Sequence, residues 1–391
     1  MAVNKNFYLT QNAMISQISN GTLSAVDYAS FVDSGKVITA LENTDIANAY
    51  LSVLGNRIAF AIDMYRSYEG KYKELVRGNV DYGNTIETIM HTFYETQAPQ
   101  WGAALPANGQ SVDMYKIARP SVNARYYVET NSYDIMRTIE RTELKKAFSS
   151  PAEMDAFIAS VIGFITNSNE RAREAGRIGM VAQGIYTAAQ ATAAKTSNTN
   201  ATHYDLLGAF LAEVGTDAGL NAASTVAECL NNERFVKFAV ATIKKVGDRM
   251  KTPSKKFSPT GALDTWTPED KRHLFINSAL EGAMDTYIYT NNYRPDRSML
   301  TNYIPVVAWQ SEDAPFDVKA TVSGETKDVK NVIGFIADEW AIGEFVTLQE
   351  METTPYNVAG RFWNYYYHGE TRYCINPDAN MVVFTIDTTS V

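Results

Sequence analysis

The chain has 391 residues, of which 45% are apolar and 20% are charged, and its net charge is −9. A chain of this length can bury a sizeable core in two or three folding units. The negative balance argues against a nucleic-acid-binding protein that relies on a basic face to neutralise phosphates. The short basic pair Lys255 and Lys256 is more typical of solvated surface than of a binding site.

Targeting and redox signals are sparse in the sequence. Two cysteines, Cys229 and Cys374, give neither a disulfide framework nor a metal-binding pair, which favours a reducing compartment. The first residues show no charged-then-apolar signal pattern. The longest largely apolar run, Ile158 to Ile165, is far shorter than the ~20 residues that span a bilayer. We therefore expect a soluble protein made in a cytoplasm, with no membrane partner.

The N-terminal third predicts an arm followed by a projecting hairpin. Residues 1–75 form the arm, with a helix starting near Asp45. Residues 82–130 predict a long β-hairpin, because apolar residues recur on both sides of Pro106-Ala-Asn-Gly109. Asn108-Gly109 favours a tight turn, since both central positions of such a turn need positive φ. A hairpin this long can project beyond its own domain and pair with a neighbouring molecule.

The clearest element lies at 150–191. Ser150-Pro151-Ala152-Glu153 has the pattern of a capping box with Pro at the first helical position. Apolar residues then recur at steps of three and four from Met154 to Ile165, which predicts one apolar helix face. A helix that continues to Ala191 would be about 60 Å long. Glycines at 163, 176, 179 and 184 weaken the helix, or they permit close packing or a bend.

The rest of the chain predicts a helix-rich region that returns to strands. Residues 196–200 predict a loop and a domain boundary, and Asn231-Asn232 can cap a helix that carries Phe235. Leu274-Phe275-Ile276 predicts a buried strand that runs into a helix from Ser278 to about Tyr287. Further strands are expected at 304–309, 332–336, 362–368 and 381–386, with the polar stretch between the first two as a loop.

Motifs for catalysis are missing from the sequence. It has no phosphate-binding loop, no GxSxG nucleophile elbow and no HExxH zinc helix. The candidate pairs His91 with Glu95, His203 with Asp205, and His368 with Cys374 are each interpreted as structural. We therefore expect no catalytic, cofactor-binding or metal-binding residue, and no enzymatic activity.

The order arm, long hairpin, long helix, mixed α/β unit and returning strand resembles that of tailed-phage major capsid proteins with the α+β HK-97 fold. Arg361-Phe-Trp-Asn-Tyr-Tyr-Tyr-His368, after Met351-Glu-Thr and before a Val-Val-Phe strand, resembles the C-terminal segment of the phi-29-like podovirus type. Gly83-Asn-Thr-Ile-Glu-Thr-Ile89 is similar to the start of that family's extended loop. Phe235-Val-Lys237 and Phe157-Ile-Ala-Ser-Val-Ile162 resemble the family's axial-domain helix and spine helix.

The resemblance implies a division of the chain into regions. These are an N-terminal arm at 1–75, an extended loop at 76–130, a peripheral domain with the spine helix at 131–200 and 355–391, and an axial domain at 201–354. The phi-29 type carries an immunoglobulin-like domain after the last strand. This sequence stops at Val391, so that domain's roles are not carried over. No Lys–Asn pair matching the crosslink of some relatives can be placed, and we predict no crosslink.

The resemblance also implies a function. Many copies of the chain would form pentamers and hexamers of an icosahedral phage head around double-stranded DNA, after assembly in the cytoplasm of the bacterial host. A scaffolding protein and a portal are further partners that this role allows. The alternatives are the shell protein of an encapsulin-like nanocompartment and a soluble α+β enzyme with an unrecognised site. The residues expected at the assembly interface lie on the hairpin: Tyr94, Trp101, Asn108, Gly109, Tyr115, Tyr126 and Tyr127.

Overall fold

The computed structural model describes residues 68–80, 85–91, 122–128, 130–143, 151–193, 201–215, 219–289, 302–322 and 324–386, with the single residues 93, 96, 99, 108, 115, 117 and 300. In the long helix, the side chains of 151–156, 158, 159, 162 and 191–193 are outside this description. The predicted arm helix near Asp45, the capping residue Ser150 and the predicted loop at 196–200 also lie outside the described residues.

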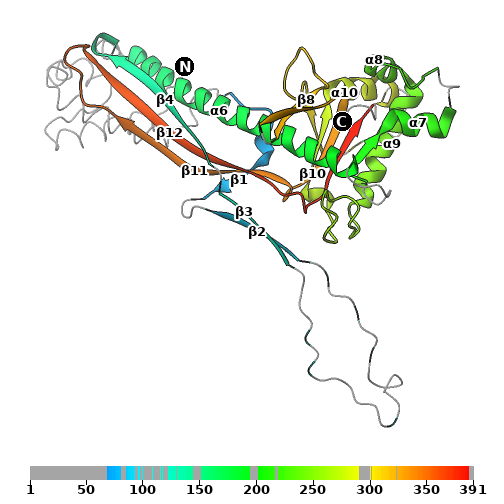
Figure 1. Ribbon diagram of the computed structural model, residues 1–391. Coiled ribbons are helices and arrows are strands. Elements are labelled where there is room, and N and C mark those ends of the chain that lie inside the picture. Colours follow the sequence, from blue (N-terminus) through cyan, green and yellow to red (C-terminus); the bar gives the residue numbers. More distant parts are fainter. Residues whose placement is uncertain are drawn as a thin grey trace.

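One sheet has four strands in the order β1-β11-β12-β4 (Figure 1). Its strands are β1 (Val76–Asn79), β4 (Asn131–Glu140), β11 (Ile342–Thr353) and β12 (Phe362–Ile375), and a 3-10 turn at Lys73–Leu75 precedes β1. Strand β1 is parallel to β11, and the other pairs are antiparallel. The predicted aromatic strand at 362–368 is confirmed but continues to Ile375, while β4 and β11 were not predicted.

A second sheet has five strands in the order β5-β13-β10-β6-β7. They are β5 (His203–Asp205), β13 (Met381–Thr385), β10 (Val332–Asp338), β6 (Arg272–Asn277) and β7 (Tyr303–Val306). Ile336, Val382 and Leu274 point into a core shared with the helices that follow β5. Phe335 and Val383 point the opposite way, into a core shared with the long helix. The central strands are thus covered on both faces, which explains their nearly continuous apolar sequence.

Short helices cover one face of this second sheet. They are α7 (Leu206–Val214), α8 (Val226–Leu230), α9 (Glu233–Arg249) and α10 (Ser278–Met284), the last followed by a π-helical turn at Asp285–Tyr289. The predicted cap at Asn232 is confirmed, because its side-chain oxygen accepts hydrogen bonds from the amides of Arg234 and Phe235. Asn277 caps α10 in the same way, at the predicted junction of strand and helix.

The long helix α6 (Pro151–Ala193) packs against both sheets and so joins them into one body (Figure 1). Its 43 residues confirm the predicted helix. Gly176 lies against the ring of Tyr373, where an added Cβ would collide with the phenol. Gly184 lies against Phe335 and Ile342, and an added Cβ would meet their side chains at 3.4 and 3.3 Å, which is tight. These two glycines therefore permit close packing on the sheets, which is one of the interpretations that the sequence left open.

Two β-hairpins extend from the sheets. Strands β2 (Ile86–His91) and β3 (Val122–Tyr127) pair antiparallel, which confirms the base of the predicted long hairpin. Strands β8 (Val318–Val322) and β9 (Glu325–Val329) form a second hairpin in the polar stretch predicted as a loop. That prediction was wrong because Val318 and Ala320 alternate with polar residues along β8 and are buried, while β9 is polar and exposed except for the buried Val329 at its end.

The predicted domain boundaries are not tested by this fold and stay a prediction. The boundary at 354/355 falls between β11 and β12, which pair with each other. The terminal strand β13, assigned to the peripheral part, lies in the five-stranded sheet. Among the described helices, none is long and apolar enough to cross a membrane.

Candidate assembly surfaces

Strands β2 and β3 form a two-stranded ribbon that leaves the body on the side opposite α6 (Figure 1). We call residues 86–91 and 122–127 the ribbon. Its two faces differ, since side chains alternate along each strand. Ile86 and Thr88 are buried, and their cross-strand partners Tyr127 and Arg125 are half-buried. This inner face lies against the turn that precedes β13.

Specific polar contacts fasten the inner face to the body. The Tyr127 hydroxyl donates to the carbonyl oxygen of Ile375 at 3.0 Å. Arg125 donates from Nε and Nη2 to the two carboxylate oxygens of Asp378, at 2.6 and 3.3 Å. Thr260 also donates to Asp378, at 2.6 Å. Burial alone would raise the pKa of Asp378, but the hydrogen bonds from Arg125 and Thr260 outweigh it and lower that pKa.

The outer face of the ribbon is apolar and exposed. Ile89 is 56% exposed, Val122 49% and Tyr126 62%. Glu87 faces Tyr126 across the pair and accepts a hydrogen bond that raises the pKa of the Tyr126 phenol. Val128, just beyond β3, is also exposed. An exposed apolar face on a two-stranded ribbon with outer edges is suited to pair or pack with another chain.

The predicted interface residues are placed as follows. Tyr94, Trp101 and Gly109 lie outside the described residues. Asn108 lies in a turn, as predicted, and Tyr115 is 85% exposed. Tyr126 belongs to the outer face, whereas Tyr127 belongs to the inner face and contacts the body. Their role in assembly is untested by these positions and stays a prediction.

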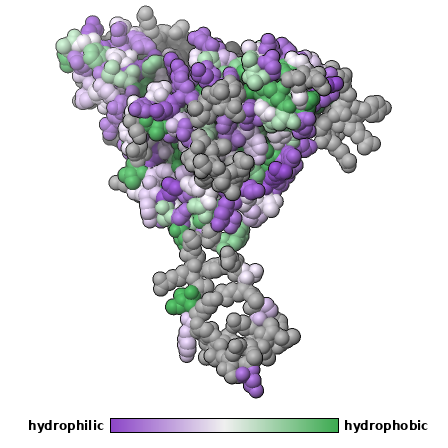
Figure 2. All heavy atoms as spheres, turned by 45° about the vertical axis from the view of Figure 1, so that its right-hand side comes forward, coloured by the Kyte–Doolittle hydropathy of each residue, from purple (hydrophilic) through white to green (hydrophobic). Residues whose placement is uncertain are grey.

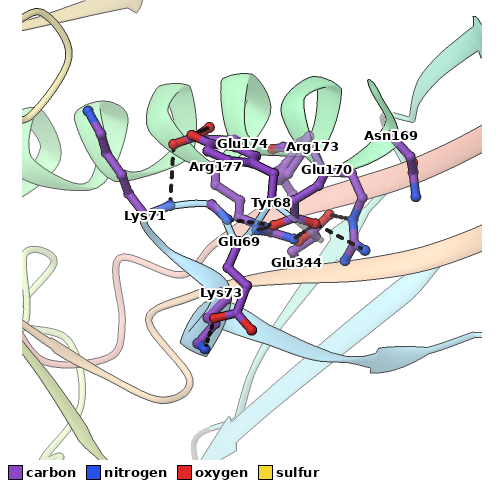
Figure 3. A network of polar contacts seen from close by, with 12 residues as sticks. Tyr68, Glu69, Lys71, Lys73, Asn169, Glu170, Arg173, Glu174, Arg177 and Glu344 are labelled. Carbon is purple, nitrogen blue, oxygen red and sulfur yellow. Dashed lines mark hydrogen bonds and ion pairs between the residues drawn. The ribbon is translucent and has the colours of Figure 1, made fainter. Parts of the chain in front are cut away.

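A second surface, which the sequence did not reveal, joins residues 68–71 to α6 (Figure 3). The Tyr68 amide donates to Asn167 Oδ1 at 2.8 Å, and its hydroxyl donates to Glu174 Oε2 at 2.6 Å. The amides of Gly70 and Lys71 donate to Glu170 and Glu174, at 3.1 and 3.3 Å. Side-chain oxygens of Asn167, Glu170 and Glu174 on the helix therefore satisfy the backbone donors of this extended segment.

The same helix face carries a buried ion-pair network (Figure 3). Glu344 of β11 is fully buried and accepts from Arg173 Nε at 2.7 Å and from Arg177 Nε at 2.5 Å. Arg177 also donates to Glu170 at 2.6 Å. The spacing Glu170, Arg173, Glu174, Arg177 puts all four side chains on one side of α6. The spacing is visible in the sequence, but alternating charges at such intervals are also typical of a solvent-exposed helix face. Only the position of Glu344 in the structure shows that the charges form a buried network.

The histidines and cysteines do not assemble into a reactive site within the described residues. His368 contacts Asp134 at 2.6 Å. It lies six residues from Cys374 on the same strand, which is about 20 Å along an extended chain. Burial raises the pKa of both Cys229 and Cys374 to about 11, which keeps both thiols protonated at neutral pH. The described chain contains no group of three or more candidate metal ligands.

Comparisons with known proteins agree with this architecture. The family model for the Phi29-like phage major capsid protein matches residues 11–385. The major capsid protein of Bacillus phage PZA is 22% identical over 362 residues, which cover 93% of this chain and 68% of the relative. That of Bacillus phage B103 is 24% identical over 346 residues, covering 88% of this chain and 65% of the relative. The chain thus spans about two thirds of the length of these relatives.

Solved structures bear on the fold. A chain in the capsid structure of Staphylococcus phage Andhra superimposes with a TM-score of 0.52 at 11% identity, covering 82% of this chain and 85% of that one. A chain in the structure of the head fiber and inner core protein gp22 of native bacteriophage P68 gives a TM-score of 0.51 at 10% identity, covering 83% and 86%. The predicted α+β, HK-97-like capsid fold is confirmed.

Proposed function

Since the chain belongs to the family of Phi29-like phage major capsid proteins and is thus a structural component of a phage head, we propose that its copies assemble as pentamers and hexamers into a closed shell around double-stranded DNA. The family match over residues 11–385 carries this proposal. The negative net charge of −9 suits a container whose DNA must stay mobile, because a strongly basic lining would bind it tightly.

We propose that the ribbon is the part of each subunit that engages a neighbouring copy. Its inner face is fastened to the parent body through Arg125 and Tyr127, so the ribbon has a defined direction where it leaves the body. Its outer face keeps Ile89 and Tyr126 exposed. Apolar and aromatic side chains are typical of interface cores, and the carboxylate of Glu87 on this face is hydrogen-bonded to Tyr126.

We propose the predicted regions as the working division of the subunit: arm at 1–75, extended loop at 76–130, peripheral domain at 131–200 and 355–391, and axial domain at 201–354. The contact of residues 68–71 with α6 supports an arm whose end is fixed on the spine helix. The pairing of β11 with β12 supports shifting the axial boundary toward 341. A scaffolding protein and a portal are proposed as partners, and the host cytoplasm as the place of assembly.

The test is the mass and content of particles formed by the purified chain. We expect pentamers, hexamers or megadalton shells by light scattering and electron microscopy, and double-stranded DNA inside native particles. A small oligomer at every concentration would favour the enzyme alternative and contradict the proposal. Shells that contain protein cargo and no DNA would favour the nanocompartment alternative.

The role of residues 92–121, which join the two strands of the ribbon and hold most of the predicted interface residues, is tested by removing them. Residues 92–121 are replaced by Asn-Gly, which keeps β2, β3 and a turn suited to join them. We expect a folded subunit, with unchanged circular dichroism, that no longer forms shells. As a control, the same Asn-Gly turn replaces residues 323–324 between β8 and β9; this variant keeps residues 92–121 and should still assemble. Normal shells from the shortened variant would refute a role of residues 92–121 in assembly.

A further inference from the structure

A cavity of about 470 Å³ lies beside the ribbon, between β2 and the five-stranded sheet. The apolar part of its lining consists of Ile89 and Met90 on the ribbon and of Trp266, Pro268 and Trp340 on the body. We call the space between these five residues the tryptophan cleft. Figure 2 shows hydrophobic surface at the foot of the body, where the ribbon leaves it.

The backbone around the two tryptophans keeps their rings exposed to solvent. Trp266 is 48% exposed, although its neighbours Thr265 and Thr267 are buried. Both threonine hydroxyls make buried hydrogen bonds inside the body, whereas the indole between them faces outward. Trp340 is 59% exposed and lies in a turn closed by the Ala341 amide and the Asp338 carbonyl. The backbone conformation and its hydrogen bonds therefore keep both rings at the surface.

A hydrogen-bonded network forms the rigid floor of the cleft. Thr267 donates to Asp338 at 2.5 Å, and the Trp340 amide donates to the same carboxylate at 2.8 Å. Asn380 donates to Thr267 at 3.0 Å and accepts from Thr265 at 2.6 Å. A buried network with its members mutually satisfied holds one geometry, so the cleft is preformed.

The two tryptophan rings are also held in place by neighbouring side chains. The Arg77 guanidinium lies 5.3 Å from the centre of the Trp340 ring, and it donates to the carbonyl oxygens of Glu339 and Ile342. Phe93 packs on Trp266, with ring centres 5.1 Å apart. Each indole is therefore supported from one side while about half of its surface is open to a partner.

We propose that the tryptophan cleft seats an apolar side chain of a second copy of this chain. The inference rests on the proposed shell and names the receiving surface. The cleft continues the outer face of the ribbon, because Ile89 belongs to both. Half-exposed tryptophans in a preformed apolar hollow are the usual anchors of protein interfaces.

Charge favours protein over nucleic acid as the occupant. The rim of the cleft carries Asp264 and the ion pair of Glu339 with Lys271 at 3.0 Å, and the buried Asp338 lies in the floor, so acidic groups outnumber basic ones. A phosphate backbone would be repelled by this rim. A neutral, apolar group from another subunit meets no such penalty, and a shell supplies that neighbour at high local concentration.

Tryptophan fluorescence tests the occupancy directly. The chain has five tryptophans, and Trp309 and Trp363 are each only 1% exposed. In a Trp101→Phe background, Trp266 and Trp340 are then the accessible rings. We expect acrylamide to quench them in free subunits and the quenchable fraction to fall at least twofold in shells assembled from the purified chain. Unchanged quenching in intact shells would overturn the inference and leave the proposed function standing.

Other occupants give distinguishable results. Protection that appears only after a different phage or host protein is added would overturn the assignment to a second copy. Protection by a small molecule in free subunits would overturn it too. Failure of the chain to form any particle would remove the proposed function and this inference together.

A matched pair of variants gives an independent readout. Trp340→Gln should raise the subunit concentration needed for assembly at least tenfold. Trp340→Phe should bring this concentration back close to that of the unaltered chain. Val358→Gln is the control, because Val358 is 79% exposed but does not line the cleft. Circular dichroism establishes that each variant folds. Equal assembly by Trp340→Gln and the unaltered chain would refute the proposal.

Discussion

Every residue of β10 is buried, whereas exposed side chains alternate along β2 and β3. Strand β10 places its apolar residues inside the chain, in cores shared with α6 and with α9. The ribbon leaves Ile89, Val122 and Tyr126 in solvent. The difference separates two tasks: β10 stabilises the subunit, and the ribbon retains apolar surface for association between subunits. Substitutions in the two regions should therefore affect different measurements.

The largest loss of stability is expected at the centre of the five-stranded sheet. Phe335 is fully buried and packs on Phe275, and α6 approaches it at Gly184. Phe335→Ala leaves a cavity and should lower the free energy of unfolding by about 4 kcal/mol. Urea denaturation of the subunit measures this loss. A change below about 1 kcal/mol would mean that β10 is not the core that its burial indicates.

A somewhat smaller loss is expected at the ion-pair network beneath α6. Arg177→Met removes one of two arginines on the buried Glu344, while Arg173 remains in contact. Leaving a buried carboxylate partly unpaired should cost about 3 kcal/mol. The double variant Arg177→Met, Glu344→Met is the control, and denaturation should show a smaller loss for it than for the single variant. Equal or greater loss in the double variant would contradict this account.

The sequence predicted the elements whose pattern is local. The three- and four-residue spacing indicated α6, and Asn232 indicated the start of α9. Continuous apolar runs indicated β6, β10 and β13, because these strands are buried on both faces. Asn108-Gly109 and the flanking apolar residues indicated the ribbon. In each case, the residues that form the element also carry the signal.

The missed features depend on partners far away in the chain. Strand β11 mixes Glu344 and Glu350 with apolar residues, and it becomes a strand by pairing with β12 and β1. Strand β4 places Tyr133, Ile135 and Ile139 on one side, but the exposed Met136 and the inward-facing Arg137 interrupt this period-2 pattern. The contact between residues 68–71 and α6 joins positions about a hundred residues apart, so no local spacing could reveal it.

At the junction of ribbon and body, a loss of about 1 kcal/mol is expected. Arg125→Met removes the ion pair with Asp378, and the arginine side chain is 40% exposed, which limits the contribution of this pair to stability. Hydrogen exchange should show faster opening of β2 and β3 while β10 is unaffected. Equal protection of the ribbon from hydrogen exchange in Arg125→Met and in the unaltered chain would show that the Tyr127 contact alone suffices to hold the ribbon on the body.

The stability of the contact between Arg125 and Asp378 should also depend on pH. The pKa of Asp378 is lower in the folded chain than in the unfolded one, where an aspartate has a pKa of about 3.9. Its contribution to stability is therefore complete well above pH 4 and is lost as the pH falls through the lower, folded value. Ribbon protection measured between pH 7 and pH 3 should fall at the acidic end. Arg125→Met should show a weaker pH dependence.

The smallest effect on stability, joined to a large effect on assembly, is expected on the outer face of the ribbon. Ile89→Ser and Tyr126→Ser change exposed side chains, so each should alter the free energy of unfolding by less than about 0.5 kcal/mol. The yield of shells, measured by light scattering, should nevertheless drop sharply, because these side chains contact a neighbouring subunit in the proposed shell and do not pack in the core of their own subunit. Val358→Ser, at another exposed apolar position, is the control and should assemble normally. If the ribbon variants assemble as well as this control, the outer face is ordinary surface and the division of tasks between β10 and the ribbon fails.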